Sequence, residues 1–202
     1  MAFIAKTIVI WAIFFSCAMA SSEAFKLTPS EQTILRSNGI IKRSKVVQGT
    51  NLREAMAIGI IDAPREAVWD VITDYAHYKD FMPRTAVSIV TDRIANTVYF
   101  YSELIIPLLF GNVSYEIALV HDKKHFTITW DLVPGTGKNV KEVRGSWKLE
   151  HYKKGKTKAI YTLFTEPDTI IPDFVINILT DQTLGEIIQV IRDRVQKVGT
   201  DS

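Results

Sequence analysis

The histidines are the first side chains to weigh as catalytic or metal-binding groups. His121 and His125 are four residues apart, a spacing that places two metal ligands on one face of a helix. Here they flank Asp122-Lys123-Lys124, a charged segment typical of a β-turn, and no cysteine or further histidine is near them in the sequence. We therefore interpret both as solvent-exposed turn residues, and we expect His77 and His151 to lie at the surface as well.

Other catalytic signatures are missing from the sequence. It contains no nucleophile-elbow motif around a serine, no phosphate-binding loop and no dinucleotide fingerprint. Glu103, Asp131 and Arg144 are charges within predicted strands, but the alternation of each strand places them opposite the larger apolar set. The sequence therefore predicts no catalytic residue, no metal site and no cofactor.

The charge balance argues against nucleic acid as a partner. The 202 residues include 24 Lys+Arg and 22 Asp+Glu, a formal net charge of +2 that is too small for a nucleic-acid-binding surface. The lysine-rich segment 153–158 could touch anionic lipid, but it is more typical of a charged hairpin tip. Length and composition indicate one domain preceded by a leader.

Residues 1–20 have the pattern of a secretory signal peptide. Lys6 gives a positive start, 7–15 is an apolar run, and Ala18-Met19-Ala20 is a small-x-small cleavage site. A bilayer core of roughly 30 Å needs about 20 apolar residues, so the run is too short to span it. We expect cleavage after Ala20 and export to a periplasm or to the exterior.

Cys17 is the only cysteine, and cleavage after Ala20 would remove it. The mature chain would then have no disulfide and would depend on its hydrophobic core, which fits a bacterial periplasm better than a eukaryotic exterior. In the alternative interpretation Cys17 is acylated and becomes the N-terminus of a lipoprotein. The residues before it, Phe14-Phe15-Ser16, match the usual lipoprotein pattern poorly.

Apolar periodicity predicts an α+β domain over residues 25–200. A capping box at Thr28-Pro29-Ser30-Glu31 begins a short helix that Gly39 ends, and Asp62 or Ala63 caps the next helix. Strands are expected at Val46-Val47 and over 55–61, followed by two short helices that stop at Pro83. Six antiparallel strands and a final helix follow; they cover 87–90, 98–103, 113–119, 126–132, 143–150, 159–164 and 172–198.

A twisted sheet closing on one long helix leaves a gap unless bulky side chains fill it. Trp130, Trp147, Tyr161 and Phe126 fall on the apolar side of their strands, so they either fill this gap or line it. The segment 104–111 is a loop by its proline and glycine, yet it is almost wholly apolar. It is either core tucked under the helix or the rim of a cavity mouth that touches a membrane or a ligand.

Three stretches resemble START-type (StAR-related lipid transfer) and polyketide cyclase proteins of the helix-grip group. They are Ala63-Pro64 to Met82-Pro83, Val143-Arg144-Gly145-Ser146-Trp147-Lys148-Leu149, with its Gly-x-Trp element, and Ile171-Pro172-Asp173-Phe174-Val175-Ile176-Asn177 with Gln182-Thr183. The likeness covers roughly residues 40 to 197. It implies a curved antiparallel sheet wrapped around a long C-terminal helix, with two short helices after the first strand and an apolar ligand held between sheet and helix.

The resemblance also implies where a ligand would lie. The gate to the cavity would be Ile105–Phe110, the 134–137 loop and the first turns after Pro172. The residues expected to line the cavity or its mouth are Phe100, Ile105, Leu108, Phe110, Tyr115, Phe126, Trp130, Trp147, Tyr161, Phe174 and Ile178.

The ligand's identity stays open at this stage. Many family members carry an Arg-Asp pair where this chain has Val113-Ser114, and we find no buried acid–base pair of the kind some steroid carriers use. We expect a monomer that binds a lipid or other hydrophobic small molecule, for transport or sensing, with transient membrane contact and without catalysis. The alternative is a polyketide cyclase or aromatase-like enzyme that uses the same cavity.

Overall fold

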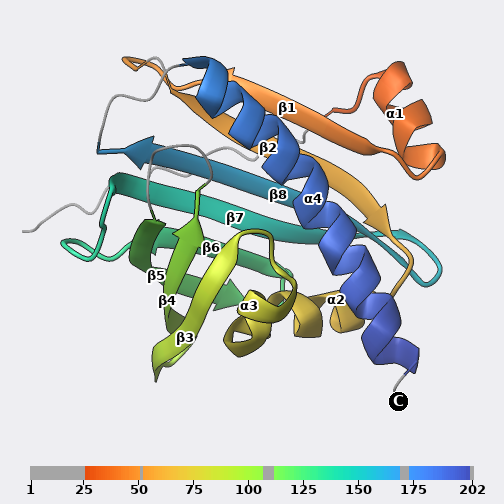
Figure 1. The fold of residues 1–202 in the computed structure, drawn as a ribbon. Helices are drawn as coiled ribbons and strands as arrows, with labels where there is room; N and C mark the ends of the chain where they lie inside the picture. The colour runs from red at the N-terminus through yellow and green to blue at the C-terminus, as the bar shows by residue number, and fades with distance from the viewer. Residues whose placement is uncertain (1–25, 51, 107–111, 169–172, 201–202) are drawn as a thin grey trace, which may run out of the picture.

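One curved antiparallel sheet and one long helix make up most of the fold. The computed structural model describes residues 26–50, 52–106, 112–168 and 173–200, and for 173–183 it describes the backbone alone. Eight strands follow the order β1-β2-β8-β7-β6-β5-β4-β3, and the last helix, α4, crosses the concave face of the sheet (Figure 1). The expected helix-grip architecture is confirmed.

The strands alternate apolar and polar residues as expected for a sheet with one covered face. Their bounds are β1 Ile40–Val46, β2 Arg53–Ile61, β3 Thr85–Ile94, β4 Thr97–Ile105, β5 Asn112–Asp122, β6 Thr127–Leu132, β7 Val140–Lys153 and β8 Lys156–Pro167. The helices are α1 Pro29–Arg36, α2 Arg65–Ile72, the 3₁₀ turn η1 Tyr75–His77, α3 Tyr78–Phe81 and α4 Asp173–Thr200. No helix in the described part of the chain is long and apolar enough to cross a bilayer.

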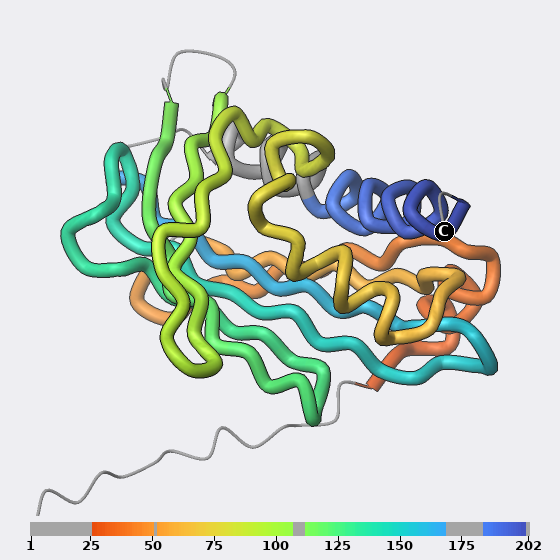
Figure 2. Tube along the Cα trace, turned by 90° about the horizontal axis from the view of Figure 1, so that it is seen from below, coloured from red at the N-terminus to blue at the C-terminus, as the bar shows by residue number. Residues whose placement is uncertain are grey.

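A crossover of short helices joins the first hairpin to the opposite edge of the sheet. After the β1–β2 hairpin, α2, η1 and α3 carry it to β3 at the far edge, and six strands then return as a meander until β8 pairs with β2. Figure 2 shows the short helices beneath one end of the sheet and α4 beside them. The short helices therefore close one end of the space under α4.

Strand β2 is covered on both faces, which explains its nearly continuous apolar sequence. Ile58 and Ile60 join Leu35 of α1 in a small outer cluster. On the inner face, a side chain at Gly59 would overlap Ile188 of α4, so the missing Cβ lets the helix approach the strand closely.

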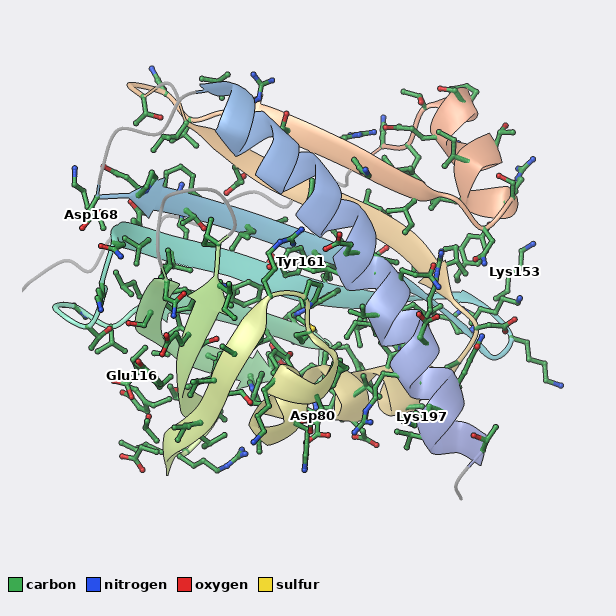
Figure 3. All side chains as sticks on the ribbon, in the orientation of Figure 1. Asp80, Glu116, Lys153, Tyr161, Asp168 and Lys197 are labelled. Atoms are coloured by element: carbon green, nitrogen blue, oxygen red, sulfur yellow. The ribbon has the colours of Figure 1, made fainter. Side chains whose placement is uncertain are left out.

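The space under α4 is tightly filled where α2 meets its C-terminal half, a region we call the packed end. Val68 and Ile72 of α2, Leu149 of β7, and Ile188 and Ile191 of α4 are all buried there in one cluster. Helix α2 contacts α4, β7 and β8. Figure 3 shows side chains crowding this region, whereas Asp80, Lys153 and Lys197 lie at the periphery.

Two helix boundaries differ from the expectation. The first helix has its predicted capping box, but the left-handed residue after it is Asn38, with φ 61°, and not Gly39. Asparagine tolerates this conformation because its short polar side chain makes local bonds. The second helix has Pro64 at its N-cap position without a side-chain cap, so neither Asp62 nor Ala63 caps it. Asp62 instead pairs with Lys156, at 2.8 Å.

The start of one strand was also wrong, and another strand exposes an apolar residue. Strand β6 begins at Thr127, and Phe126 closes the preceding turn with a left-handed φ of 54°, which turns its side chain away from the strand's alternation. In β3 the apolar residue faces outward: Ile89 is 50% exposed and Ser88 is buried. The Ser88 hydroxyl donates to the carbonyl of Ala76 and accepts from the amide of Lys79, which ties β3 to the short helices.

Candidate functional site

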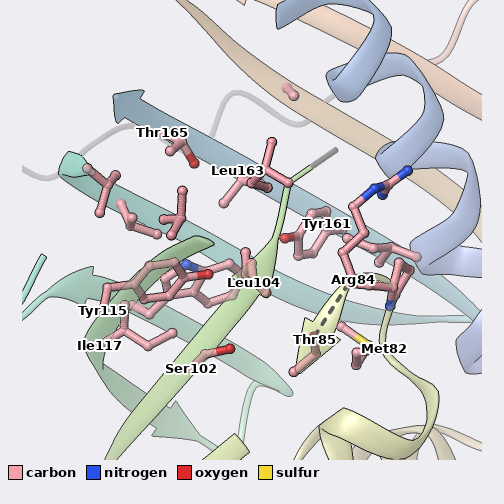
Figure 4. Close-up of a pocket in the computed structure, with 18 of the residues that line it drawn as sticks. Met82, Arg84, Thr85, Ser102, Leu104, Tyr115, Ile117, Tyr161, Leu163 and Thr165 are labelled. Atoms are coloured by element: carbon pink, nitrogen blue, oxygen red, sulfur yellow. Dashed lines mark hydrogen bonds between the residues drawn. The ribbon is translucent and has the colours of Figure 1, made fainter. Parts of the chain in front are cut away.

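A cavity of about 290 Å³ lies between the concave face of the sheet and α4. Its size is at the lower end of the range for small-molecule pockets, roughly 300–1,000 Å³. Every strand from β2 to β8 contributes to the lining, and Leu184 and Ile187 close it from the helix. We call this region the cavity end; the lumen and its labelled side chains are drawn in Figure 4.

Three aromatic rings form one wall of the cavity. Tyr161 of β8 packs against Trp147 of β7, with ring centroids 4.7 Å apart, and against Trp130 of β6, at 5.7 Å. All three are buried and line the lumen, so both tryptophans lie on the concave side, as their alternation predicted. Such pairs add about 0.5–1.5 kcal/mol to the burial of their area, which favours a wall of fixed shape.

Gly145 explains the Gly-x-Trp element of β7. It is the cross-strand partner of Trp130, and a side chain on Gly145 would overlap both the Trp130 indole and the carbonyl oxygen of Thr162. Two residues further along, Trp147 is opposite Tyr161. The glycine thus leaves room for one indole, and the tryptophan supplies the other.

The deep polar groups of the cavity are neutral hydroxyls. Burial raises the pKa of the Tyr115 phenol to about 12. Burial, and to a smaller extent the nearby Tyr115, raises the pKa of Tyr161 well above its ordinary value. Ser102 is opposite Tyr115 on the neighbouring strand and also lines the lumen. Both phenols are therefore protonated, and able to donate, across the physiological pH range.

An ion pair bridges the edge of the cavity. The Arg84 guanidinium, on the segment between α3 and β3, binds Glu186 of α4 through two nitrogen–oxygen contacts of 3.0 and 3.5 Å. Arg84 lines the cavity and has a left-handed φ of 60°, which is uncommon for a residue with a side chain. The pair connects α4 to the segment between α3 and β3.

The loop with two glycines, 134–137, is fastened to β5. The Thr136 hydroxyl accepts from the amide of Glu116 at 3.1 Å, and the amide of Lys138 donates to the carbonyl of Ser114 at 2.8 Å. Gly135 has a φ of 81°, as expected for a glycine turn, but a side chain at Gly137 would overlap the backbone of Val140. The two glycines are therefore explained by the tight turn itself, and no movement of the loop is needed to account for them.

The structure brings together five of the residues predicted to line the cavity: Phe100, Tyr115, Trp130, Trp147 and Tyr161. Ile105 ends β4 with 53% of its surface exposed, while its neighbours Leu104 and Ile106 face the lumen. Leu108 and Phe110 lie outside the described residues, as do the side chains of Phe174 and Ile178.

Phe126 lies elsewhere, at the packed end. Its ring meets Trp69 of α2 edge-on at 5.7 Å, and the Arg65 guanidinium lies 4.4 Å from its centroid. The left-handed turn conformation described above removes it from the lining, so its assignment to the cavity is not supported by its position. Its ring helps to attach α2 to the β5–β6 turn.

Sequence reasoning missed several lining residues. Leu163 and Thr165 continue the alternation of Tyr161, and Leu104 continues that of Phe100. Extending the same alternation along each strand would therefore have predicted them. Tyr78 and Met82, from α3 and the residue after it, had no such signal. They reach the cavity because the short helices lie beneath its end. Their place in the lining therefore follows from the topology and not from a local sequence pattern.

Three of the four histidines, His77, His125 and His151, are exposed as predicted, and His121 is half-buried. His125 is exposed and pairs with Asp122 in the turn, as predicted, and His77 is exposed and pairs with Asp74. His121 is half-buried: its Nε2 is 2.7 Å from the Tyr75 hydroxyl, and its ring lies against Trp69. The expectation of a solvated turn histidine was wrong for His121, because β5 extends through Asp122 and carries the ring against α2 and η1.

Among the described residues that line the cavity there is no aspartate, glutamate, histidine, lysine or cysteine. The described part of the chain also has no group of three or more such side chains placed to hold a metal ion. The lining can therefore exclude water from an apolar molecule and donate hydrogen bonds to it. These residues offer it no carboxylate or imidazole as a general base.

Comparison with solved structures shows the same fold in lipid-transfer and cyclase proteins. A STAR-related lipid transfer protein from Xanthomonas axonopodis has a TM-score of 0.69 and 20% identity, over 78% of this chain and 94% of that one. The Zhui aromatase/cyclase from a Streptomyces species has a TM-score of 0.62 and 12% identity, over 72% and 94%. Human StAR-related lipid transfer protein 5 has 0.65 and 11%, over 80% and 84%.

No curated protein matches the sequence. The sequence profile described as polyketide cyclase / dehydrase and lipid transport matches residues 61–192, well over half of the chain. This span runs from the end of β2 to Arg192 of α4 and includes most of the cavity lining. The chain therefore belongs to the polyketide cyclase/dehydrase and lipid transport family.

Proposed function

We propose that this protein binds a lipid or another hydrophobic small molecule in the cavity under α4 and releases it chemically unchanged. The observation that carries the proposal is the lining itself: apolar and aromatic side chains, with neutral hydroxyls as the deep polar groups. Burial of apolar surface contributes roughly 25 cal/mol per Å², so such a lining can bind a hydrophobic molecule without an ion pair. Transport or sensing would follow from binding and release.

A binding titration with an uncharged fluorophore tests this proposal. N-phenylnaphthylamine, which brightens in apolar surroundings, should bind the wild-type protein in a saturable way and be displaced by hydrophobic competitors. Ala55→Trp should abolish binding, because Ala55 is buried and lines the cavity, whereas Ala86→Trp, at an exposed position on β3, should leave it intact. Equal binding by both variants would place the fluorophore outside the cavity.

A cyclase is the second candidate, and two observations favour it. The family that the chain belongs to includes polyketide cyclases, and the phenols of Tyr115 and Tyr161 could polarise a carbonyl group. Mass spectrometry of a poly-β-ketone probe incubated with the protein distinguishes the candidates. Loss of water from the probe, or a cyclic isomer of the same mass with a different chromatographic retention, would support a cyclase if the Tyr115→Phe and Tyr161→Phe variants do not form it; recovery of the uncyclised probe supports binding alone.

We also propose that residues 1–20 direct export, that the mature domain is a monomer, and that it touches membranes transiently. Lys6, the apolar run and Ala18-Met19-Ala20 support export. N-terminal sequencing of the exported protein should begin at Ser21. A chain that begins with acylated Cys17 would replace this proposal with a lipoprotein.

A further inference from the structure

We propose that the cavity selects a hydrophobic ligand that carries one uncharged oxygen, a carbonyl or hydroxyl, and that the hydroxyls of Tyr115 and Tyr161 donate hydrogen bonds to that oxygen. The inference rests on the proposed function, because it names the chemical class of ligand for the same cavity. It also defines a specificity that the apolar lining alone would not provide.

The two phenols face the same lumen from different strands. Tyr115 comes from β5 and Tyr161 from β8, and Figure 4 shows their side chains pointing toward one another across the cavity. They are close enough that Tyr115 contributes to the raised pKa of Tyr161. Ser102, opposite Tyr115 on β4, adds a third hydroxyl to the same lining.

The contrast with Tyr75 and Tyr78 shows that Tyr115 and Tyr161 have no hydrogen-bond partner within the described protein. The Tyr75 hydroxyl is 2.7 Å from His121 Nε2, and the Tyr78 hydroxyl donates to the carbonyl of Ile72 at 2.6 Å. Tyr115 and Tyr161 form no hydrogen bond with any residue that the structure describes. Neither hydroxyl is closed off from the cavity, so its hydrogen-bond partner comes from what fills the cavity, water or a ligand.

The lining points to an uncharged acceptor. Neutral phenols are donors that match a carbonyl or hydroxyl oxygen. A ligand ammonium group would meet no described carboxylate in the lining. The lining has two guanidinium groups: Arg84 at the edge is engaged with Glu186, and Arg53 is exposed and donates to the Ser44 hydroxyl. A charge placed beside the aromatic wall of Trp130, Trp147 and Tyr161 would lose its hydration without a partner, which is costly.

A matched pair of probes tests the inference. Acetylnaphthalene and ethylnaphthalene share a ring system and differ in one carbonyl oxygen. We expect wild-type protein to bind the ketone more tightly, and each of Tyr115→Phe and Tyr161→Phe to reduce that preference about two- to tenfold, the range for one uncharged hydrogen bond. Tyr101→Phe is the control, because Tyr101 is absent from the cavity lining. Isothermal titration gives the dissociation constants.

The outcomes separate this inference from the proposal beneath it. A preference lost in the Phe variants and kept in Tyr101→Phe supports it. If all proteins bind both probes with an unchanged ratio, the oxygen is not recognised by these phenols and the inference is wrong, while hydrophobic binding stands. If wild-type protein binds neither these probes nor N-phenylnaphthylamine, the cavity does not bind apolar molecules and both proposals fall together.

Discussion

The packed end and the cavity end share one sheet and one helix, yet one is filled and the other is hollow. Ile187 and Ile191 are one turn apart on α4 and similarly buried, but only Ile187 lines the cavity. At the packed end, Val68 and Ile72 of α2 occupy the space beneath the helix; no α2 residue reaches the lining. The short crossover helices, more than the sheet, determine where the interior is open.

The largest expected difference between the two ends is the cost of removing a side chain. Ile191→Ala should lower the free energy of unfolding by about 3–5 kcal/mol, because well-packed neighbours cannot collapse into the new space. Ile187→Ala should cost about 2 kcal/mol or less, because one side of Ile187 already faces a void. Chemical denaturation measures both. Equal losses, with no change in probe affinity for Ile187→Ala, would contradict the distinction.

Two glycines allow a second comparison. Gly59→Ala forces a methyl group against Ile188 at the packed end, and Gly145→Ala forces one against Trp130 at the cavity end. Each should destabilise the fold by about 1–3 kcal/mol through overpacking. Only Gly145→Ala should also weaken binding of N-phenylnaphthylamine, because it displaces a wall of the cavity. Thermal unfolding and the titration together decide; weakened binding in Gly59→Ala alone would reverse the assignment.

The ion pair at the cavity edge should affect exchange more than stability. Exposed pairs contribute about 0.2–1 kcal/mol, so Glu186→Gln should scarcely change the free energy of unfolding. Stopped-flow fluorescence should show faster binding and release of the probe, because α4 loses its link to Arg84. Asp62→Asn, which removes the remote pair with Lys156, is the control. Unchanged rates in Glu186→Gln would show that the ion pair does not limit exchange of the probe.

The smallest effect is a pH dependence that belongs to the packed end. Burial, with a minor contribution from Arg93, lowers the pKa of His121. The unfolded chain then binds more protons, so stability should fall as pH drops below about 6.5 and level off below the folded pKa. Comparison with His121→Gln by denaturation across this window isolates the effect. A wild-type slope identical to that of the variant would show that His121 does not titrate there.

Much of the fold was predictable because it depends on local patterns. The period-two alternation from Val98 to Leu163 identified the meander, and the capping box at Thr28 located α1. Five lining residues followed from the same alternation, since a strand residue's face is set by its parity. At two places the alternation did not give the correct face of the sheet, and each has a local backbone irregularity. Phe126 has a left-handed φ, and bulges flank Ser88 in β3.

What the sequence could not show was which interior space stays empty. Trp130 and Ile128 have the same pattern of neighbours along β6, yet only Trp130 lines the cavity. That difference depends on the position of α2 and α3 beneath the sheet, and thus on contacts between residues far apart in the chain. That the hydroxyls of Tyr115 and Tyr161 have no hydrogen-bond partner among the described residues is likewise evident only from the assembled sheet.

Native mass spectrometry of the mature protein, purified without detergent from its own cells, tests the central claim most directly. We expect a fraction of molecules to carry one small hydrophobic compound each, released intact into organic solvent. Ala55→Trp, which fills the cavity, should carry none, and Ala86→Trp should match the wild type. Folded wild-type protein that carries no such compound and takes none from liposomes would contradict the account.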